Sequence, residues 1–184
     1  MRTILPEKEN PALREIAREI PIADIGSVRI KKLISEMKAL LAKEEYGVAL
    51  AASQVGEPLR LFIVSGKALA RDGRNSPDEP EKNKELPAVP DQVYINPVVL
   101  KMSRTKKEKH EGCLSVRGKW GIVPRAEKTM LSAYDEKGEK STRGASGFLA
   151  HVFQHEMDHL DGVLYTDKAE SLYDDTKVHS PEGE

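Results

Sequence analysis

Cysteine is nearly absent from this sequence, since Cys113 is the only one in 184 residues. A single thiol excludes an intrachain disulfide, so a packed core must stabilise the fold, and a reducing compartment suits such a chain. Aromatic residues are also scarce, at 5%, whereas hydrophobic residues as a whole make up 39% of the sequence. At this length, the composition predicts one globular domain with a substantial core.

Long apolar runs and an excess of one charge are also missing. No segment approaches the ~20 apolar residues of a membrane-spanning helix, and the first residues lack the apolar centre of a secretion signal. Lys and Arg number 29 against 30 for Asp and Glu, which gives a net charge of −1. We therefore expect a cytoplasmic protein that no overall field draws to nucleic acid or membranes. The basic run 104–110 is interpreted as a solvated hairpin face, and a transient ribosome contact there would rest on charge alone.

Hydrophobic periodicity predicts helices separated by a group of strands. Apolar residues recur at helical spacing after Ser27, which is a suitable N-cap, again over 146–160, and in a shorter pattern over 13–20. Strand-like segments lie between them, and the first long one after the middle of the chain is interrupted by Asn96-Pro97; the segments are 59–64, 92–100, 113–116, 121–123 and 129–134. Strands grouped in this way favour an α+β fold over a βαβ winding.

Residues 71–90 are charged and contain four prolines, so they have little to bury. We expect a long mobile loop inside a single domain that covers residues 1–184, because too few residues flank it for two separate cores. The last residues, about 176–184, are expected to form a flexible tail.

The motif with the most chemical content is His155-Glu156-Met157-Asp158-His159, an H-E-x-x-H pattern within the predicted helix 146–160. Four residues advance a helix by about 400°, so both imidazoles leave the same face about one turn apart. They can bind one metal ion, and Glu156 can act on a water bound to that ion. The pattern indicates metal-assisted hydrolysis, although surface histidines at a helix end would give the same letters.

Two further segments bear on this site. Cys113 lies within Glu-Gly-Cys-Leu-Ser, and a thiolate with two imidazoles and one water would give a four-coordinate metal with an open position. Residues 47–54, Gly-Val-Ala-Leu-Ala-Ala-Ser-Gln, combine small side chains with a terminal amide, which permits close approach of another backbone. Taken alone, the first is equally typical of a buried cysteine and the second of ordinary packing.

In this order, the three segments resemble the peptide deformylase family, whose pattern is G-x-G-x-A-A-x-Q, then E-G-C-x-S, then Q-H-E-x-D-H. The matches run from Gly47 to Gln54, from Glu111 to Ser115 and from Gln154 to His159. The resemblance implies antiparallel β-sheets packed around a central metal-binding helix that carries H-E-x-x-H. It also implies removal of the formyl group from the N-terminal formyl-methionine of newly made polypeptides.

The resemblance assigns roles to individual residues. Cys113, His155 and His159 would hold one metal ion per chain. That ion would typically be Fe²⁺, with Ni²⁺, Co²⁺ or Zn²⁺ as alternatives, whereas the ligand types alone suggest zinc. Glu156 would transfer protons, and the Gln54 amide and the Leu114 backbone N–H would stabilise the oxyanion.

Substrate binding is also implied by the resemblance. The extended peptide would pair with backbone near Gly47, Val48 and Ala49, as a strand added to a sheet edge. Ala49 stands where the family pattern has glycine, which is harmless only if no positive φ is needed. His151 lies one turn before His155, where the resemblance leads us to expect an apolar residue facing the methionine pocket. We place His151 at the pocket rim rather than on the metal.

The same residues are also compatible with other functions. A thermolysin-like H-E-x-x-H metallopeptidase would need a distal glutamate ligand, and a Cys–His hydrolase would remain active in the presence of a chelator. A deformylase-like scaffold without turnover would bind peptide or metal only. Each makes a different prediction for formate release with and without chelator.

Overall fold

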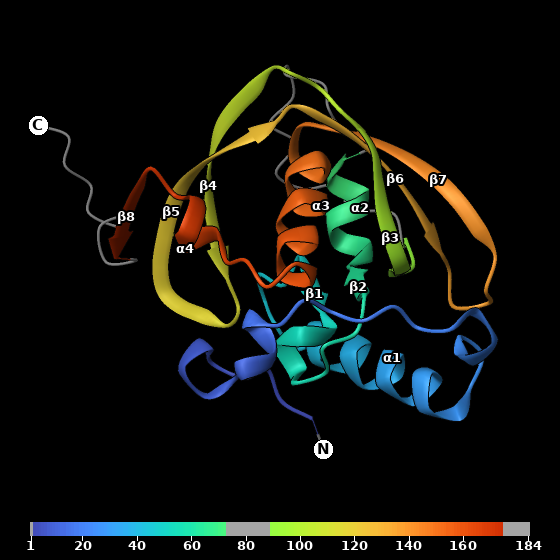
Figure 1. Ribbon diagram of the computed structural model, residues 1–184. Helices are drawn as coiled ribbons and strands as arrows, with labels where there is room; N and C mark the ends of the chain where they lie inside the picture. Colours follow the sequence, from blue (N-terminus) through green and yellow to red (C-terminus); the bar gives the residue numbers. More distant parts are fainter. Residues whose placement is uncertain (1, 73–88, 175–184) are drawn as a thin grey trace, which may run out of the picture.

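The computed structural model describes residues 2–72 and 89–174 of the chain (Figure 1). Its longer elements in chain order are α1 (Val28–Leu41), β1 (Ala49–Ala51), β2 (Leu61–Val64), α2 (Gly66–Asp72), β3 (Gln92–Met102), β4 (Lys106–Cys113), β5 (Val116–Ala126), β6 (Lys128–Tyr134), β7 (Lys140–Ser146), α3 (Gly147–Leu160), α4 (Tyr165–Lys168) and β8 (Ser171–Asp174). Short 3₁₀ turns are η1 (Glu7–Glu9), η2 (Pro11–Arg14), η3 (Ile22–Asp24) and η4 (Ala52–Val55).

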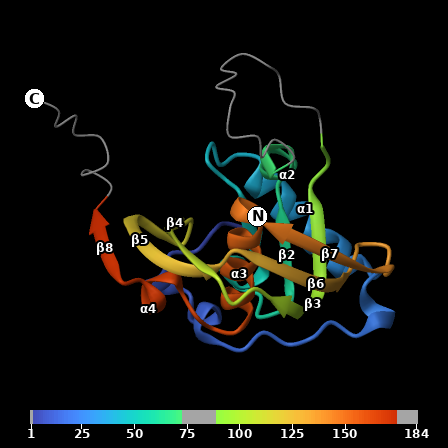
Figure 2. The ribbon, with the colours of Figure 1, turned by 90° about the horizontal axis from the view of Figure 1, so that it is seen from above.

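The strands form two sheets. One has five strands in the order β1-β2-β3-β6-β7, and the other has three in the order β4-β5-β8. All pairs of these strands are antiparallel, as the family resemblance implied. Figures 1 and 2 show α3 standing between the two sheets, with α1 packed on the far side of the larger one. Two sheets and a few helices therefore enclose α3.

The larger sheet carries apolar side chains on both faces. On one face, Phe62 and Tyr94 stack with ring centroids 4.8 Å apart, and Phe153 of α3 meets the Tyr94 ring edge-on at 5.1 Å. Aromatic pairs of this kind stabilise beyond the area that they bury. The opposite face of the sheet packs against the buried stripe of α1: Ile30, Leu33, Ile34, Met37 and Leu41. The aromatic contacts attach α3 to one face of the sheet, and α1 covers the other.

Several local predictions are confirmed. Ser27 caps α1, and its hydroxyl accepts a hydrogen bond from the Ile30 amide at 3.3 Å. The helix predicted over 146–160 is α3, and its residues Leu149, Phe153 and Leu160 are fully buried. Within the described residues, no helix combines the length and hydropathy that crossing a membrane requires.

The prediction of a helix over 13–20 is wrong. Only η2 is helical there, and the next residues run extended: the Ala17 amide donates to the Leu160 carbonyl at 2.8 Å, and Arg18 bridges to Leu59. Backbone groups of this segment therefore find partners in distant parts of the chain, which outweighs the local helical pattern. The loop expected at 71–90 begins within α2 and otherwise falls mainly on 73–88, which, like the tail at 176–184, lies outside the described residues.

The interruption expected at Asn96-Pro97 does not end β3. The strand continues from Gln92 to Met102, with a shift in its pairing to β6 between Ile95 and Val98. Asn96 adopts a φ of 48°, and its side-chain amide bonds both backbone groups of Ile20, at 2.8 and 2.7 Å. A β-bulge thus accommodates the proline.

Candidate active site

Three potential metal ligands come together where the end of β4 meets α3. One ligand atom from each of Cys113, His155 and His159 lies within 4.8 Å of the others. The Cys113 Sγ is 3.3 Å from the His159 Nε2, and the two imidazole rings stand nearly perpendicular, with centroids 4.9 Å apart. The i, i+4 spacing on α3 places both rings on one face, and the β4–β5 hairpin carries the thiol to that face. Thiolate and imidazole are the donors that zinc and iron accept.

The orientation of His155 is set by a buried carboxylate. The Nδ1 of His155 lies 3.0 Å from the Glu111 Oε2. Burial alone would raise the pKa of Glu111, but hydrogen bonds from Arg125, His151 and His155 together hold it well below its usual value. Glu111 is therefore a carboxylate that accepts the His155 Nδ1–H, which leaves the Nε2 lone pair of His155 free for a metal.

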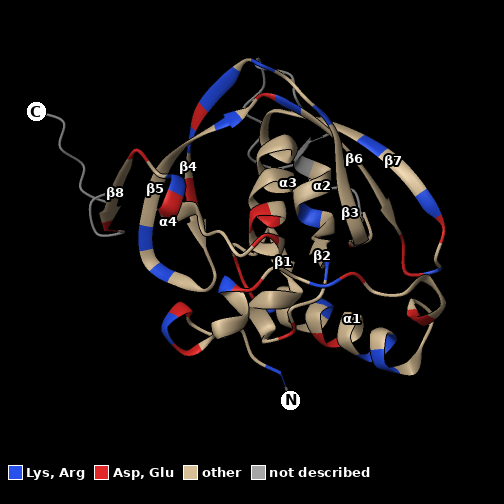
Figure 3. Cartoon of the chain, viewed as in Figure 1, with Lys and Arg blue, Asp and Glu red and all other residues tan. Residues whose placement is uncertain are grey.

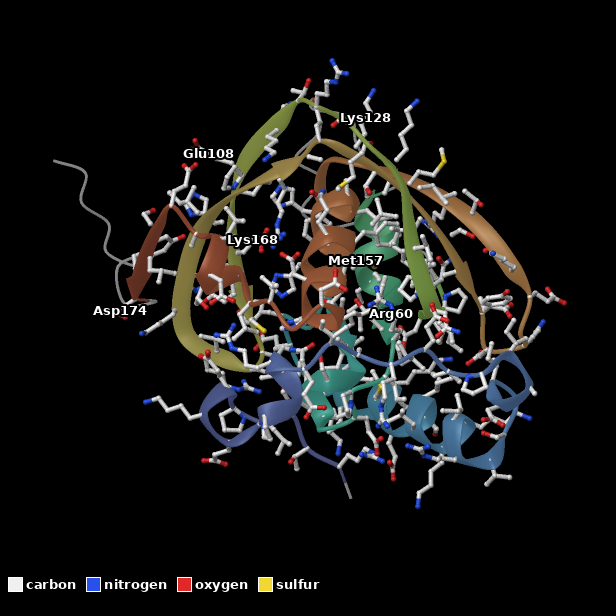
Figure 4. The ribbon with its side chains drawn as sticks, in the orientation of Figure 1. Arg60, Glu108, Lys128, Met157, Lys168 and Asp174 are labelled. Carbon is white, nitrogen blue, oxygen red and sulfur yellow. The ribbon has the colours of Figure 1, made fainter. Side chains whose placement is uncertain are left out.

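The same carboxylate belongs to a chain of buried charges. Arg125 binds Glu111 with two hydrogen bonds, Nε to Oε1 at 2.7 Å and Nη2 to Oε2 at 2.9 Å. Its remaining nitrogen donates to Asp158, which also accepts from Lys168 Nζ at 2.6 Å. Figure 4 labels Lys168, which projects from α4 in the space between β5 and α3. Glu111 and Arg125 are only 8% and 4% exposed, so this ion pair lies in the interior of the protein rather than on its surface.

Tyr165 packs on the other side of His155. The two rings stack with centroids 6.1 Å apart, and the tyrosine hydroxyl donates to the Lys119 carbonyl at 2.9 Å. Tyr165 is 1% exposed. His155 is therefore held by a carboxylate on its edge and by an aromatic ring on its face, and both fix its direction.

Glu156 is buried beside this cluster, at 3% exposure, and its Oε2 has no hydrogen-bonding partner among the described residues. Burial raises the pKa of Glu156 to about 7; the neighbouring His155 opposes this shift, and the negative charge of Glu111 reinforces it. A carboxyl group with a pKa near neutrality can both take up and release a proton. The free, buried oxygen fits a polar molecule such as water in the adjacent space.

Gln54 approaches the thiol from η4. Its Oε1 accepts a hydrogen bond from the Ala51 amide at 2.8 Å, which fixes the orientation of the side-chain amide. Its Nε2 consequently points to the Cys113 Sγ and the Ser115 Oγ, each at 3.4 Å. An N–H donor is thereby held next to the candidate metal ligands, in a position to stabilise negative charge.

A cavity of about 430 Å³ opens directly onto this group. Leu114 lies on its wall beside Cys113, and Val48 and Ala49 lie on the side of β1. The remaining wall comes from Tyr46, which lies between α1 and β1, and from the β4–β5 hairpin and α3. The residues of the hairpin and α3 that line it include Lys109, His110, Trp120, Phe148, His151, Val152, His155 and Glu156. Two cavities of about 490 and 510 Å³ lie elsewhere and contain none of the three candidate ligands.

β1 is one of the two edge strands of the larger sheet, so one of its edges has no strand partner within the described part of the chain. Ala49 pairs with Val64, and its φ is not positive, so the departure from glycine causes no strain. Gly47 is not on the cavity wall. A Cβ there would lie 2.9 Å from both the Glu44 Cβ and the Leu41 Cδ1, so close packing against α1 explains the glycine.

His151 also lies on the cavity wall and is 6% exposed. Its Nδ1 is 3.3 Å from the Glu111 Oε1. It does not belong to the group of three candidate ligands.

The sequence did not predict the roles of several residues of the site. Asp158 and Lys168 extend the buried charge chain, and Tyr165 packs on His155. Gln154 fastens α3 to β5, because its amide bonds both the N–H and the carbonyl of Ala126, at 2.9 and 2.8 Å. Asp158 and Gln154 belong to the Q-H-E-x-D-H motif, but the sequence did not indicate their roles because most of their partners are distant in the chain.

The sequence of the chain is similar to those of known proteins. A family model described as "Polypeptide deformylase" matches residues 1–175. A curated relative, peptide deformylase 1A of Arabidopsis thaliana, is 38% identical over 163 residues, covering 86% of this chain and 58% of the relative. Peptide deformylase 1 of Bordetella pertussis is 36% identical over 175 residues, covering 94% and 92%. The chain thus spans little more than half the length of the plant relative.

The fold is likewise similar to solved structures. A peptide deformylase from Synechococcus elongatus in complex with actinonin superposes with a TM-score of 0.72 at 30% identity, covering 92% of this chain and 79% of the other. A peptide deformylase from Thermotoga maritima gives 0.73 at 28% identity, covering 93% and 99%.

Proposed function

The chain belongs to the polypeptide deformylase family, and we propose that it hydrolyses the formyl amide at the N-terminal formyl-methionine of newly made polypeptides. The observation that carries this proposal is the convergence of Cys113, His155 and His159 on one cavity with the buried Glu156 carboxyl, whose Oε2 has no hydrogen-bonding partner among the described residues. A metallopeptidase with a glutamate ligand is less well supported, because the nearby Glu111 is fully engaged by Arg125 and the histidines.

The donor set fits a divalent metal ion, since one thiol and two imidazoles face one another within 4.8 Å. When bound, such an ion supplies Lewis acidity to an attacking water and to the formyl oxygen. We propose Fe²⁺ as the ion, one per chain, on the strength of the family resemblance, with Ni²⁺, Co²⁺ or Zn²⁺ as substitutes.

Proton transfer is assigned to Glu156. Its carboxylate takes a proton from the water that attacks the formyl carbon, and then delivers it to the departing amine nitrogen as the C–N bond breaks. Formate and a free amino terminus result. The raised pKa of Glu156, caused first by its burial, suits both directions of transfer.

Stabilisation of the oxyanion is assigned to the Gln54 side-chain amide and to the Leu114 backbone N–H. The Gln54 Nε2 is held toward the site by the bond between its Oε1 and the Ala51 amide. A donor that is fixed beforehand stabilises the developing charge without reorganisation. The peptide would extend along β1 past Val48 and Ala49, which line the cavity; Gly47 would then act by allowing the chain to pack close to α1.

We further propose that residues 1–184 form one catalytic domain that acts in the cytoplasm, where formylated chains are made. Its partners would be these nascent chains, and a transient ribosome contact would use the exposed basic residues of β4, such as Lys106 and Lys107. Figure 3 shows blue stretches of Lys and Arg along this strand.

A formate-release assay tests the main proposal. The protein, loaded with Fe²⁺ or Ni²⁺, should release formate from formyl-Met-Ala-Ser, and a chelator should abolish the release. Activity that persists without metal would instead support a Cys–His hydrolase. A fully loaded protein that releases no formate would indicate a scaffold without turnover.

A further inference from the structure

His151 is a polar residue on the cavity wall, beside apolar side chains of α3 and β1. It lies four residues before His155 on α3, and Phe148, Val152 and Val48 line the same region. Four residues rise about 6 Å along a helix. A peptide whose formyl carbon lies beside Cys113 and Glu156 would therefore direct a long first side chain toward His151.

The hydrogen-bonding state of His151 follows from its partner. Its Nδ1 lies 3.3 Å from the Glu111 Oε1, an oxygen that also accepts from Arg125 at 2.7 Å. A carboxylate only accepts, so Nδ1 of His151 must carry the proton in this contact. The Nε2 of a neutral imidazole with this tautomer is an acceptor. Glu111 thus directs an acceptor atom away from itself.

That acceptor is unsatisfied. The Nε2 of His151 is buried and has no hydrogen-bonding partner among the described residues. A buried polar atom without a partner is unfavourable, and a ligand group that donates a hydrogen bond removes the penalty. The neighbouring polar groups are already engaged: Gln54 bonds Ala51, and Glu111 accepts from Arg125 and both histidines.

We propose that His151 determines specificity for the first side chain by accepting a hydrogen bond from it at Nε2. This inference rests on the proposed deformylase function and adds a substrate class to it. Formylated peptides whose first side chain has the length of methionine and ends in a donor, such as the amide of glutamine, are processed alongside formyl-Met. A wholly apolar pocket would reject such a side chain because its amide would lose its water.

The test compares two formylated peptides that differ mainly in this property. Formyl-Gln-Ala-Ser carries a donor, whereas formyl-Nle-Ala-Ser is the apolar counterpart of formyl-Met-Ala-Ser. The measured quantity is the ratio of kcat/KM for Gln to that for Nle, at one pH and equal metal content. His151→Leu should lower this ratio by about two- to tenfold, the ordinary worth of one hydrogen bond.

His151→Asn is the matched control, because its amide can donate to Glu111 from near the position of Nδ1 but has no group at the position of Nε2. The ratio should fall in this variant as well. An unchanged ratio in both variants would overturn the proposal. A fall in His151→Leu alone would also overturn it, since it would show that His151 acts only by positioning Glu111.

Dissociation constants measured in the Glu156→Gln background separate this proposal from the proposed function. The Gln:Nle preference in binding should again depend on His151, even without turnover. If it does while the wild-type protein releases no formate, the specificity stands and the deformylase function fails. If neither peptide binds, or if binding ignores His151, the specificity proposal fails.

Discussion

Arg125 donates a hydrogen bond to each carboxylate oxygen of Glu111 in the interior of the protein, from its Nε at 2.7 Å and from its Nη2 at 2.9 Å. The pair joins β5 to β4 directly behind the candidate metal ligands, and His155 donates to the same carboxylate. Planar, two-point pairing of this kind fixes direction as well as charge. The position of His155 thus depends on a strand pair that it does not belong to.

Removing one partner of this ion pair should destabilise the fold and weaken metal binding. Glu111→Gln leaves the Arg125 guanidinium buried with a neutral partner, and breaking a buried ion pair on one side typically costs ~3–5 kcal/mol. We expect a lower free energy of unfolding, measured by urea denaturation, and a 10–100-fold loss of metal affinity through misdirected His155. Arg117→Gln, which breaks the exposed contact with Glu44, is the control and should change stability little. Equal stability of both variants would contradict the structural role of Glu111.

Stability should fall in acid because of the same carboxylate. Hydrogen bonds from Arg125 and the two histidines, acting against burial, hold the pKa of Glu111 well below its usual 4.5. The unfolded chain therefore takes up a proton near pH 4.5 that the folded chain does not bind, so the contribution of Glu111 is complete above about pH 5 and declines as the pH falls below it. Thermal midpoints measured from pH 6 to pH 3 should fall more steeply for the wild type than for Glu111→Gln. Parallel curves would assign the acid sensitivity to other groups.

Glu156→Gln should retain the fold and the metal but lose turnover by about 10²–10⁴-fold, because an amide neither accepts nor delivers the proton. Metal content and circular dichroism should match the wild type, since Glu156 is not among the three candidate ligands. Near-normal formate release from a metal-loaded variant would remove Glu156 from the mechanism.

Cys113→Ser should weaken metal retention, because a neutral hydroxyl is a poor substitute for a thiolate. Metal analysis after dialysis against a chelator should show lower occupancy than in the wild type. If the ion is ferrous, peroxide should inactivate the wild-type protein and nickel substitution should protect it. Equal metal occupancy in the variant would exclude Cys113 as a ligand.

Short-range features of this molecule could be predicted from the sequence alone. The Ser27 cap and the spacing of apolar residues in α1 and α3 depend on contacts within one or two helical turns, and they appear as predicted. The geometry of His155 and His159 follows in the same way from helix periodicity. The three motifs in order sufficed for the family, which the comparisons confirm.

Tertiary structure decided whatever depends on partners far away in the chain. Residues 13–20 have a helical pattern, but Ala17 pairs with Leu160 and Arg18 with Leu59, so the segment is extended. The charge chain from Glu111 through Arg125 to Asp158 joins three elements, and no local pattern indicates which acid the arginine selects. His151 is similar: its place on α3 could be read from the helical spacing, but only the packing of β4 against α3 gives its Nδ1 a carboxylate and leaves its Nε2 without a partner. Periodicity reports which face of an element a residue occupies, whereas hydrogen bonding between elements depends on how those faces meet.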